Sequence, residues 1–208
     1  ELKSEQIKLE GSLKTAGTKL HAKRLESTQF IQSALIGYLS DVDLPKAKIE
    51  LMWQEQAPSS IGLYKPLFMF SANPGSPLES LNKVASGGEQ SRVKLALKAA
   101  LGKHITLSCQ VFDEIDTGIS GATAEKVGNL MSDLAKNQQI ITITHLPQVA
   151  SKGNTHWQIS KSSTDTTTES NVNVLTDESR VDELARMLSG AKITQAAKNQ
   201  AEALLKAR

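Results

Sequence analysis

Three short stretches of the sequence carry groups that suit phosphate chemistry. The first, Ser86-Gly87-Gly88-Glu89, opens a run in which apolar residues recur at helical spacing. A hydroxyl residue and two glycines at a helix start leave backbone N–H groups accessible, and such a helix end favours bound anions. An ordinary capped helix is the alternative interpretation, because Ser and Gly are also common there for backbone reasons.

The second and third stretches are apolar, β-prone runs that end in polar residues. One ends at the paired carboxylates Asp113 and Glu114, 27 residues after Ser86, and the other ends at His145. Apolar residues at helical spacing over 127–134 predict a helix between them, so the segments form a β-α-β unit with parallel strands. Their carboxyl ends then share one edge of a sheet, where open α/β sheets bind ligands.

Phosphoryl transfer needs a metal that is held and a water that is aimed. Asp113 suits the metal role because Mg²⁺ prefers carboxylate oxygens. Glu114 would polarise the attacking water as a general base. A solvated strand end is the alternative interpretation of this carboxylate pair.

In this order, SGGE, a strand ending in DE and a strand ending in TH resemble the C-terminal half of an ABC-type ATPase head. Four blocks narrow the resemblance to the RecN family of bacterial DNA repair proteins, relatives of the SMC proteins. They are FSANPG (70–75), VASGGE (84–89), FDEIDTG (112–118) and ITHLPQVA (143–150). Residues 180–190 (RVDELARMLSG) resemble the family's closing helix, and the similarity covers residues 66–205.

The resemblance implies an ATP hydrolase that uses ATP and Mg²⁺. It implies that Asp113 holds the metal, that Glu114 is catalytic and that His145 hydrogen-bonds the γ-phosphate. The signature residues that would face ATP held by the opposite subunit are Ser86, Gly87, Gly88 and Glu89. The loop that communicates across the dimer would contain Asp116, Thr117 and Gly118.

One part of an ATP site is missing from the sequence. The phosphate-loop pattern G-x-x-x-x-G-K-[ST] does not occur, and residues 190–194 lack both its spacing and its placement after a strand. In the family that the chain resembles, this loop lies in an N-terminal segment, and a coiled coil separates the two halves. We therefore expect half a catalytic head, inactive alone and excised from a longer protein. Its expected partners are the N-terminal half, a second copy through ATP-engaged heads, and DNA.

Residues 1–42 read as one long helix with apolar residues on two seven-residue periods. The positions are Leu2, Leu9, Ala16 and Phe30 on one period, and Leu13, Leu20 and Ala34 on the other. This pattern is typical of a coiled-coil seam, here interrupted at Lys23 and Ser27. A plain amphipathic surface helix is the alternative. We expect the absent half to cover this seam and the apolar face of residues 66–70.

The expected architecture is α/β, with residues 1–43 as a coiled-coil arm segment and residues 44–208 as the C-terminal lobe of the head. In that lobe a mainly parallel sheet would be flanked by helices. Beyond the elements above, the pattern predicts strands at 48–54, 67–70, 155–159 and 172–175, a loop at 57–65, a polar hairpin tip at 162–171, and two closing helices around Leu184 and Ala201. Trp53 is expected to pack in the core.

Composition describes an ordinary soluble globular protein, with 22% charged and 39% hydrophobic residues. The net charge is only +2, so composition gives no independent support for DNA contact. The single cysteine, Cys109, lies in a predicted core strand, and a reducing compartment fits. No apolar run is long enough to span a membrane. We expect a cytoplasmic, nucleoid-associated protein with no membrane partner.

Three functions remain open at this point. The leading one is the ATPase half of a RecN-like protein that acts in double-strand-break repair and recombination. The second is another SMC relative, chromosome-organising or nuclease-associated, with the same head chemistry. The third is a non-catalytic interaction module without a phosphate loop. A phosphate loop and a long heptad region upstream would support the first two only.

Overall fold

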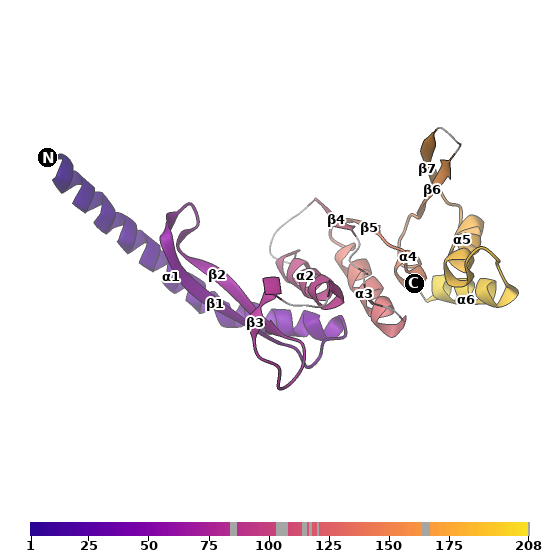
Figure 1. Cartoon of the computed structure of the whole chain (residues 1–208), viewed down its shortest axis with the longest axis horizontal. Coiled ribbons are helices and arrows are strands. Elements are labelled where there is room, and N and C mark those ends of the chain that lie inside the picture. The colour runs from indigo at the N-terminus through magenta and orange to yellow at the C-terminus, as the bar shows by residue number, and fades with distance from the viewer. Residues whose placement is uncertain are drawn as a thin grey trace. The chain divides into compact units, whose positions relative to one another are not determined.

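The computed structural model describes residues 1–83, 87–102, 108–113, 116, 118–119, 121–163 and 167–207 (Figure 1). The chain divides into two compact units, Glu1–His104 and Ile105–Arg208. The first unit contains α1 (Leu2–Asp41), β1 (Lys48–Ser59), β2 (Gly62–Ser71), β3 (Glu79–Ser80), the 3-10 turn η1 (Leu81–Lys83) and α2 (Gly87–Gly102). The second contains β4 (Cys109–Asp113), α3 (Gly121–Leu134), β5 (Gln139–Ile143), α4 (Pro147–Ala150), β6 (Trp157–Ser163), β7 (Thr168–Val174), α5 (Asp177–Ser189) and α6 (Gln195–Lys206).

Helix α1 confirms the long N-terminal helix predicted from the sequence. The antiparallel hairpin β1–β2 runs along its C-terminal part, and its N-terminal part projects beyond the hairpin (Figure 1). The helix face that meets the hairpin and the core below it is a docking stripe of Gly17, His21, Arg24, Thr28, Ile31 and Leu35. Each of these residues follows a position of the predicted coiled-coil seam by one, which is about 100° around the helix. The seam and the docking stripe are therefore two different faces of α1.

Aromatic and polar contacts fasten the docking stripe to the hairpin. His21 stacks on Tyr64 with 3.8 Å between ring centroids. Arg24 Nη1 donates to the carbonyl of Ile61 at 2.8 Å, and its guanidinium lies 5.5 Å from the ring centroid of Trp53. Trp53 Nε1 in turn donates to Thr28 Oγ1 at 3.0 Å. Trp53 therefore packs between helix and hairpin, half-buried, with both its ring and its N–H in use.

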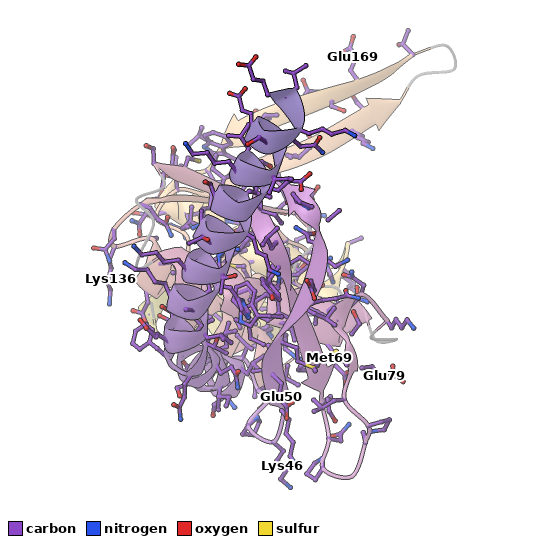
Figure 2. All side chains as sticks on the ribbon, turned by 90° about the vertical axis from the view of Figure 1, so that its left-hand side faces the viewer. Lys46, Glu50, Met69, Glu79, Lys136 and Glu169 are labelled. Carbon is purple, nitrogen blue, oxygen red and sulfur yellow. The ribbon has the colours of Figure 1, made fainter. Side chains whose placement is uncertain are left out.

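The hairpin is longer than the sequence pattern predicts. Residues 57–65 were expected to form a loop, but β1 continues to Ser59 and β2 starts at Gly62, so the prediction was wrong. Pro58 is tolerated because the register shifts between Glu55 and Ser59, and proline is accommodated at such irregularities. Further along the hairpin the register is regular, with Glu50 opposite Met69 (Figure 2).

The core of the first unit gathers α1, the hairpin and α2. Its buried members are Leu35, Leu39, Leu44, Ala47, Ile49, Phe70, Val93 and Ala96. Phe70 is only 2% exposed, so the apolar face of residues 66–70 is largely covered within this chain rather than waiting for a partner. The expectation that the absent half covers residues 66–70 is therefore wrong.

The β-α-β crossover predicted for the second unit is confirmed. Strands β4 and β5 pair in parallel, from Cys109 opposite Gln139 to Asp113 opposite Ile143. Helix α3 between them buries the predicted apolar face: Val127, Leu130, Met131 and Leu134. Among the described strands this is the one parallel pair, because β1–β2–β3 and β6–β7 are antiparallel.

Strand β4 has one buried and one exposed face. Gln110 and Phe112 point inward, at 6% and 1% exposure, whereas Cys109 is exposed. The expectation that Cys109 lies in a core strand is therefore wrong, because the side chains of a strand alternate between its two faces. Gln110 is accommodated on the inner face because its Nε2 donates to Gln138 Oε1 at 3.0 Å.

The chain closes with a hairpin and two helices. Strands β6 and β7 extend further than predicted, so the polar tip is shorter than residues 162–171. Helices α5 and α6 begin at threonine caps and pack through Leu184, Ala185, Ala197 and Ala201, as predicted for two closing helices. Over the residues that the structure describes, no helix is long and apolar enough to cross a membrane.

Candidate functional site

The candidate site of the second unit lies where β4 and β5 end. Asp113 is the last residue of β4 and is opposite Ile143, the last residue of β5. Since the strands are parallel, the residues that follow them emerge at the same edge. Asp113 is exposed there, and His145 follows two residues after the end of β5.

A buried carboxylate, Asp116, joins the two loops at this edge. Its side chain is 1% exposed. Thr144 Oγ1 donates a hydrogen bond to Asp116 Oδ2, and the backbone N–H of His145 donates to the same oxygen at 3.1 Å. No hydrogen-bond donor in the described part of the chain reaches the other oxygen, Oδ1. Hydrogen bonds to a carboxylate are stronger than neutral ones, so Asp116 holds the start of the His145 loop firmly.

The imidazole of His145 points outward from this anchor. Its side chain is 72% exposed, and Nδ1 lies 3.5 Å from Asp116 Oδ2. Leu146 N–H donates to Thr144 Oγ1 at 3.0 Å, so Thr144 links Asp116 to the segment that leads into α4. The backbone around His145 is thus fixed, while most of its ring is exposed to solvent.

The loop after β4 is shaped by a glycine. The N–H of Ile119 donates to the carbonyl of Asp116 at 3.2 Å, and Gly118 has φ of 74°, a conformation that glycine adopts without steric cost. Asp116 and Gly118, predicted for the inter-subunit loop, therefore lie in a tight turn that buries the Asp116 side chain within its own chain.

The signature-type helix start belongs to the first unit. Helix α2 begins at Gly87, with Gly88 buried and Glu89 half-buried in its first turn. A Cβ at Gly87 would meet nothing within 4 Å, so this end of the helix is sterically open. Beside it, Glu89 helps line a cleft of about 240 Å³ formed with the loop that leads from β2 to β3.

The apolar face of α2 differs in part from the predicted one. Val93 is buried as predicted, and Leu97 and Ala100 pack against the core. Leu101 was expected on the same face but is 52% exposed. The structure also buries three residues of α2 that were not predicted to lie on this face: Leu95, Ala96 and Ala99.

Three predicted site residues lie outside the described residues. They are Ser86 of the signature, the general-base candidate Glu114, and Thr117 of the inter-subunit loop. Their roles stay predictions. The described residues do bring Asp113, Asp116 and His145 to one edge, while Gly87, Gly88 and Glu89 belong to the other unit.

The donor chemistry at the strand end fits Mg²⁺. Asp113 offers an exposed carboxylate, a hard oxygen donor of the kind that Mg²⁺ prefers. Among the described residues no group of three or more His, Cys, Asp or Glu side chains forms a metal cluster. In nucleotide sites Mg²⁺ is usually held by one or two carboxylates together with substrate phosphates.

Sequence reasoning missed Thr144 and the local role of Asp116. The sequence signal was a threonine directly before His145, the histidine predicted to meet the γ-phosphate. A threonine hydroxyl can both donate and accept a hydrogen bond. Pairing it with Asp116 required the parallel register of β4 and β5.

The comparisons with solved structures define the class of fold. One similar chain comes from work on ATP-driven dimerization and DNA-stimulated activation of SMC ATPases, with a TM-score of 0.56 and 20% identity over 82% of this chain and 99% of that chain. The Smc head domain with coiled coil and joint from Pyrococcus yayanosii has a TM-score of 0.62 and 20% identity, and the match covers 88% of this chain and 35% of that chain. The Smc head from Pyrococcus furiosus, bound to the C-terminal domain of ScpA, has a TM-score of 0.60 and 20% identity. The match covers 90% of this chain and 47% of that chain. The chain has the fold of an SMC head domain.

The chain is also similar to curated proteins, although no protein-family model matches it. It is homologous to proteins named DNA repair protein RecN, so the resemblance predicted from its motifs is confirmed. The RecN of Rickettsia conorii is 39% identical over 99% of this chain, and those of Deinococcus radiodurans and Vibrio cholerae are 38% and 36% identical over 98%. The chain spans 36–38% of the length of these relatives.

Proposed function

We propose that this chain is the C-terminal part of the head of a RecN-like, SMC-type ATPase. In the whole protein, ATP binding and hydrolysis in a head dimer would serve DNA double-strand-break repair and recombination. The observation that carries the proposal is the edge where Asp113, Asp116 and His145 meet, in a chain homologous to RecN. Homology at 36–39% identity supports RecN over the chromosome-organising SMC proteins, because the similar SMC structures are only 19–20% identical to this chain.

The residues of this edge divide the work of ATP hydrolysis. Asp113 would hold Mg²⁺, which when bound neutralises phosphate charge. Glu114 would accept a proton from the attacking water. His145 would donate a hydrogen bond to the γ-phosphate, with its backbone fixed by Asp116. A preorganised donor of this kind lowers the barrier because it needs no reorientation as charge develops.

The signature residues would act on a different ATP molecule. Gly87, at the open start of α2, and Ser86, the residue before it in the sequence, would face the γ-phosphate of ATP held by a second copy. A helix N-terminus favours an anion through its partial positive charge and its free N–H groups. Two such heads would then trap two ATP molecules between them, and hydrolysis would release the dimer.

Exposed apolar surfaces of this chain support the N-terminal half of the same protein as a partner. On hairpin β6–β7, Trp157 is opposite Val174 and Ile159 is opposite Val172, and all four are 59–67% exposed on one face. A two-stranded hairpin with an uncovered apolar face is marginal alone, so a covering element is expected. Val111 and Ile143 are also half exposed, at 53% and 47%, on the outer face of β4–β5.

Helix α1 would complete the coiled-coil arm. Leu2, Leu9, Leu13 and Leu20 of its seam are 41–84% exposed. Because the docking stripe lies about 100° away, α1 can hold the hairpin and a partner helix at the same time. We propose residues 1–43 as the arm segment and residues 44–208 as the head lobe, in a cytoplasmic protein that meets DNA on the nucleoid.

The proposal is tested with the whole protein that contains this chain. It should hydrolyse Mg-ATP, form a dimer that depends on ATP, and restore survival after double-strand breaks to a strain that lacks it. A whole protein that binds and hydrolyses no ATP, yet still restores survival, would point to the non-catalytic interaction module.

A further inference from the structure

Helix α4 is the first element after His145, and two distant parts of the second unit hold it. We propose that Arg180 of α5 is a positioning residue for His145, and that Gly128 of α3 serves the same purpose from the other side. The inference rests on the proposed function, because it assigns His145 to the γ-phosphate. It concerns how this chain places the histidine, a role that no motif of the sequence indicates.

The connection from His145 to α4 is short and stiff. Only Leu146 separates them, and it is the N-cap of α4. Its carbonyl accepts from Val149 N and Ala150 N at 3.1 and 3.0 Å. Pro147 occupies the first turn, where its ring fixes φ. A displacement of α4 would therefore move the backbone of His145 by a similar amount.

Arg180 holds the far end of α4. Its side chain is 3% exposed, and Nη2 donates to the carbonyls of Gly153 at 2.8 Å and Ser151 at 3.3 Å. Nη1 lies 3.5 Å from the carbonyl of Asn154. Ser151 is the C-cap of α4, and Gly153 and Asn154 follow it in the chain, so the guanidinium binds the segment that leaves the helix. A planar guanidinium can satisfy several carbonyls at once. A cation is placed at the C-terminal end of α4, where backbone dipoles favour it.

Arg180 is itself on a fixed support. Leu184 and Ala185 of the same helix are fully buried against Ala197 and Ala201 of α6. Helix α6 also meets the end of α4, because Lys152 Nζ donates to the carbonyl of Ala207 at 2.7 Å. The guanidinium thus ties α4 to the packed α5–α6 pair.

Gly128 holds α4 from the side of α3. A Cβ built there would lie 3.1 Å from the carbonyl oxygen of Gln148 and from Cγ of Lys152, and 3.4 Å from Cα of Val149. Two of these atoms are backbone, so α4 must move by a few tenths of an ångström if Gly128 gains a methyl group. Helix α4 is therefore held in close contact with Gly128 of α3 and with Arg180 of α5.

The test uses the whole protein and measures kcat and KM for ATP. In Arg180→Lys the charge stays, but one ammonium cannot reach the same set of carbonyls. We expect kcat to fall about tenfold or more, with KM within about twofold, because small misplacements of catalytic groups are costly. Gly128→Ala should act in the same direction. Arg186→Lys on the same helix, which contacts Glu183 instead of α4, and Gly37→Ala, which meets open space, are the matched controls.

A double variant separates positioning from general damage to the fold. If Arg180 acts through His145, Arg180→Lys adds no further loss to His145→Ala. A further tenfold loss would overturn the inference, as would near-normal kcat in Arg180→Lys. If circular dichroism shows that Arg180→Lys does not fold, Gly128→Ala with the same double variant decides in its place. A wild-type protein without ATP turnover would instead overturn the proposed function, and this inference with it.

Discussion

The backbone N–H of His145 donates a 3.1 Å hydrogen bond to Oδ2 of Asp116, a carboxylate that is 1% exposed. This contact joins the loop after β4 to the loop after β5. The motifs FDEIDTG and ITHLPQVA are far apart in the sequence, with 32 residues from Asp113 to His145. This hydrogen bond connects them in the folded chain.

Asp116→Asn should weaken this centre. The amide keeps the size of the carboxylate but removes the charge that the Thr144 hydroxyl and the His145 N–H bind. Because hydrogen bonds to a charged group contribute about 1.5–3 kcal/mol each, we expect a loss of about 1–3 kcal/mol in the free energy of unfolding. Urea denaturation of the chain measures it. Asp133→Asn, at a surface carboxylate that is 66% exposed and paired with Lys136, is the control and should change stability by at most about 0.5 kcal/mol. Equal stability of the two variants would contradict the account.

The sequence predicted the edge but not the contact within it. Hydrophobic runs and the intervening helix were enough to place Asp113 and His145 together, since parallel strands bring their carboxyl ends to one side. The hydrogen bond from Thr144 to Asp116 depends on the turn at Gly118 and on the exact register, which local patterns do not specify. Arg180 was missed for the same reason, because its partners are backbone carbonyls of another element.

Faces of elements were harder to predict than the elements themselves. Helix α1 was located correctly, yet the stripe that packs within the chain lies one residue beyond the predicted seam and includes the polar residues His21 and Arg24. Cys109 was placed in a core, but among the described residues it lies on the exposed face of β4. Burial depends on which neighbours are present, and a sequence pattern does not supply them.

The isolated chain should neither bind Mg-ATP tightly nor hydrolyse it. Asp113 would hold the metal, but the sequence contains no phosphate loop that could cradle the nucleotide. Calorimetry of the 208-residue chain with Mg-ATP should show no micromolar binding. Adding the N-terminal half as a separate polypeptide should restore binding. Micromolar affinity of this chain alone would show that it has a nucleotide site of its own.

The exposed seam of α1 and the apolar face of hairpin β6–β7 should make the isolated chain self-associate. Large exposed apolar patches favour association. We expect the average mass from light scattering to rise with concentration, and Leu9→Lys on the seam to reduce the rise. Ile7→Lys is the control, because Ile7 is 70% exposed but lies off the seam. A monomer at high concentration, or an equal effect of both substitutions, would count against the seam.

Stability should fall in mild acid because of His156. Burial lowers the pKa of His156, the nearby Arg180 lowers it further, and Glu183 opposes this in part. The folded chain therefore binds a proton less readily than the unfolded chain, whose histidine has its usual pKa of 6.5. The stabilisation is present above that value and is lost as pH falls below it towards the folded pKa.

His156→Gln should reduce the difference in unfolding free energy between about pH 7.5 and about pH 5.5. Burial alone would raise the pKa of Glu183, but hydrogen bonds from Arg186 and Gln158 lower it below its usual value. The stabilisation from Glu183 is lost only at more acidic pH, so it does not enter this window. An unchanged pH difference in His156→Gln would remove His156 as the cause.

Turnover and sizing of Glu114→Gln in the whole protein test the central claim most directly. The substitution keeps size and hydrogen bonding but removes the general base, which typically costs about 10²–10⁴ in rate. Asp113 would still hold the metal and Ser86 would still close the opposite site. The account predicts an ATP-bound, head-engaged dimer that accumulates in Mg-ATP with little hydrolysis, whereas Asp113→Asn should weaken engagement itself. Near-normal turnover in Glu114→Gln would contradict it and leave this edge as part of the fold alone.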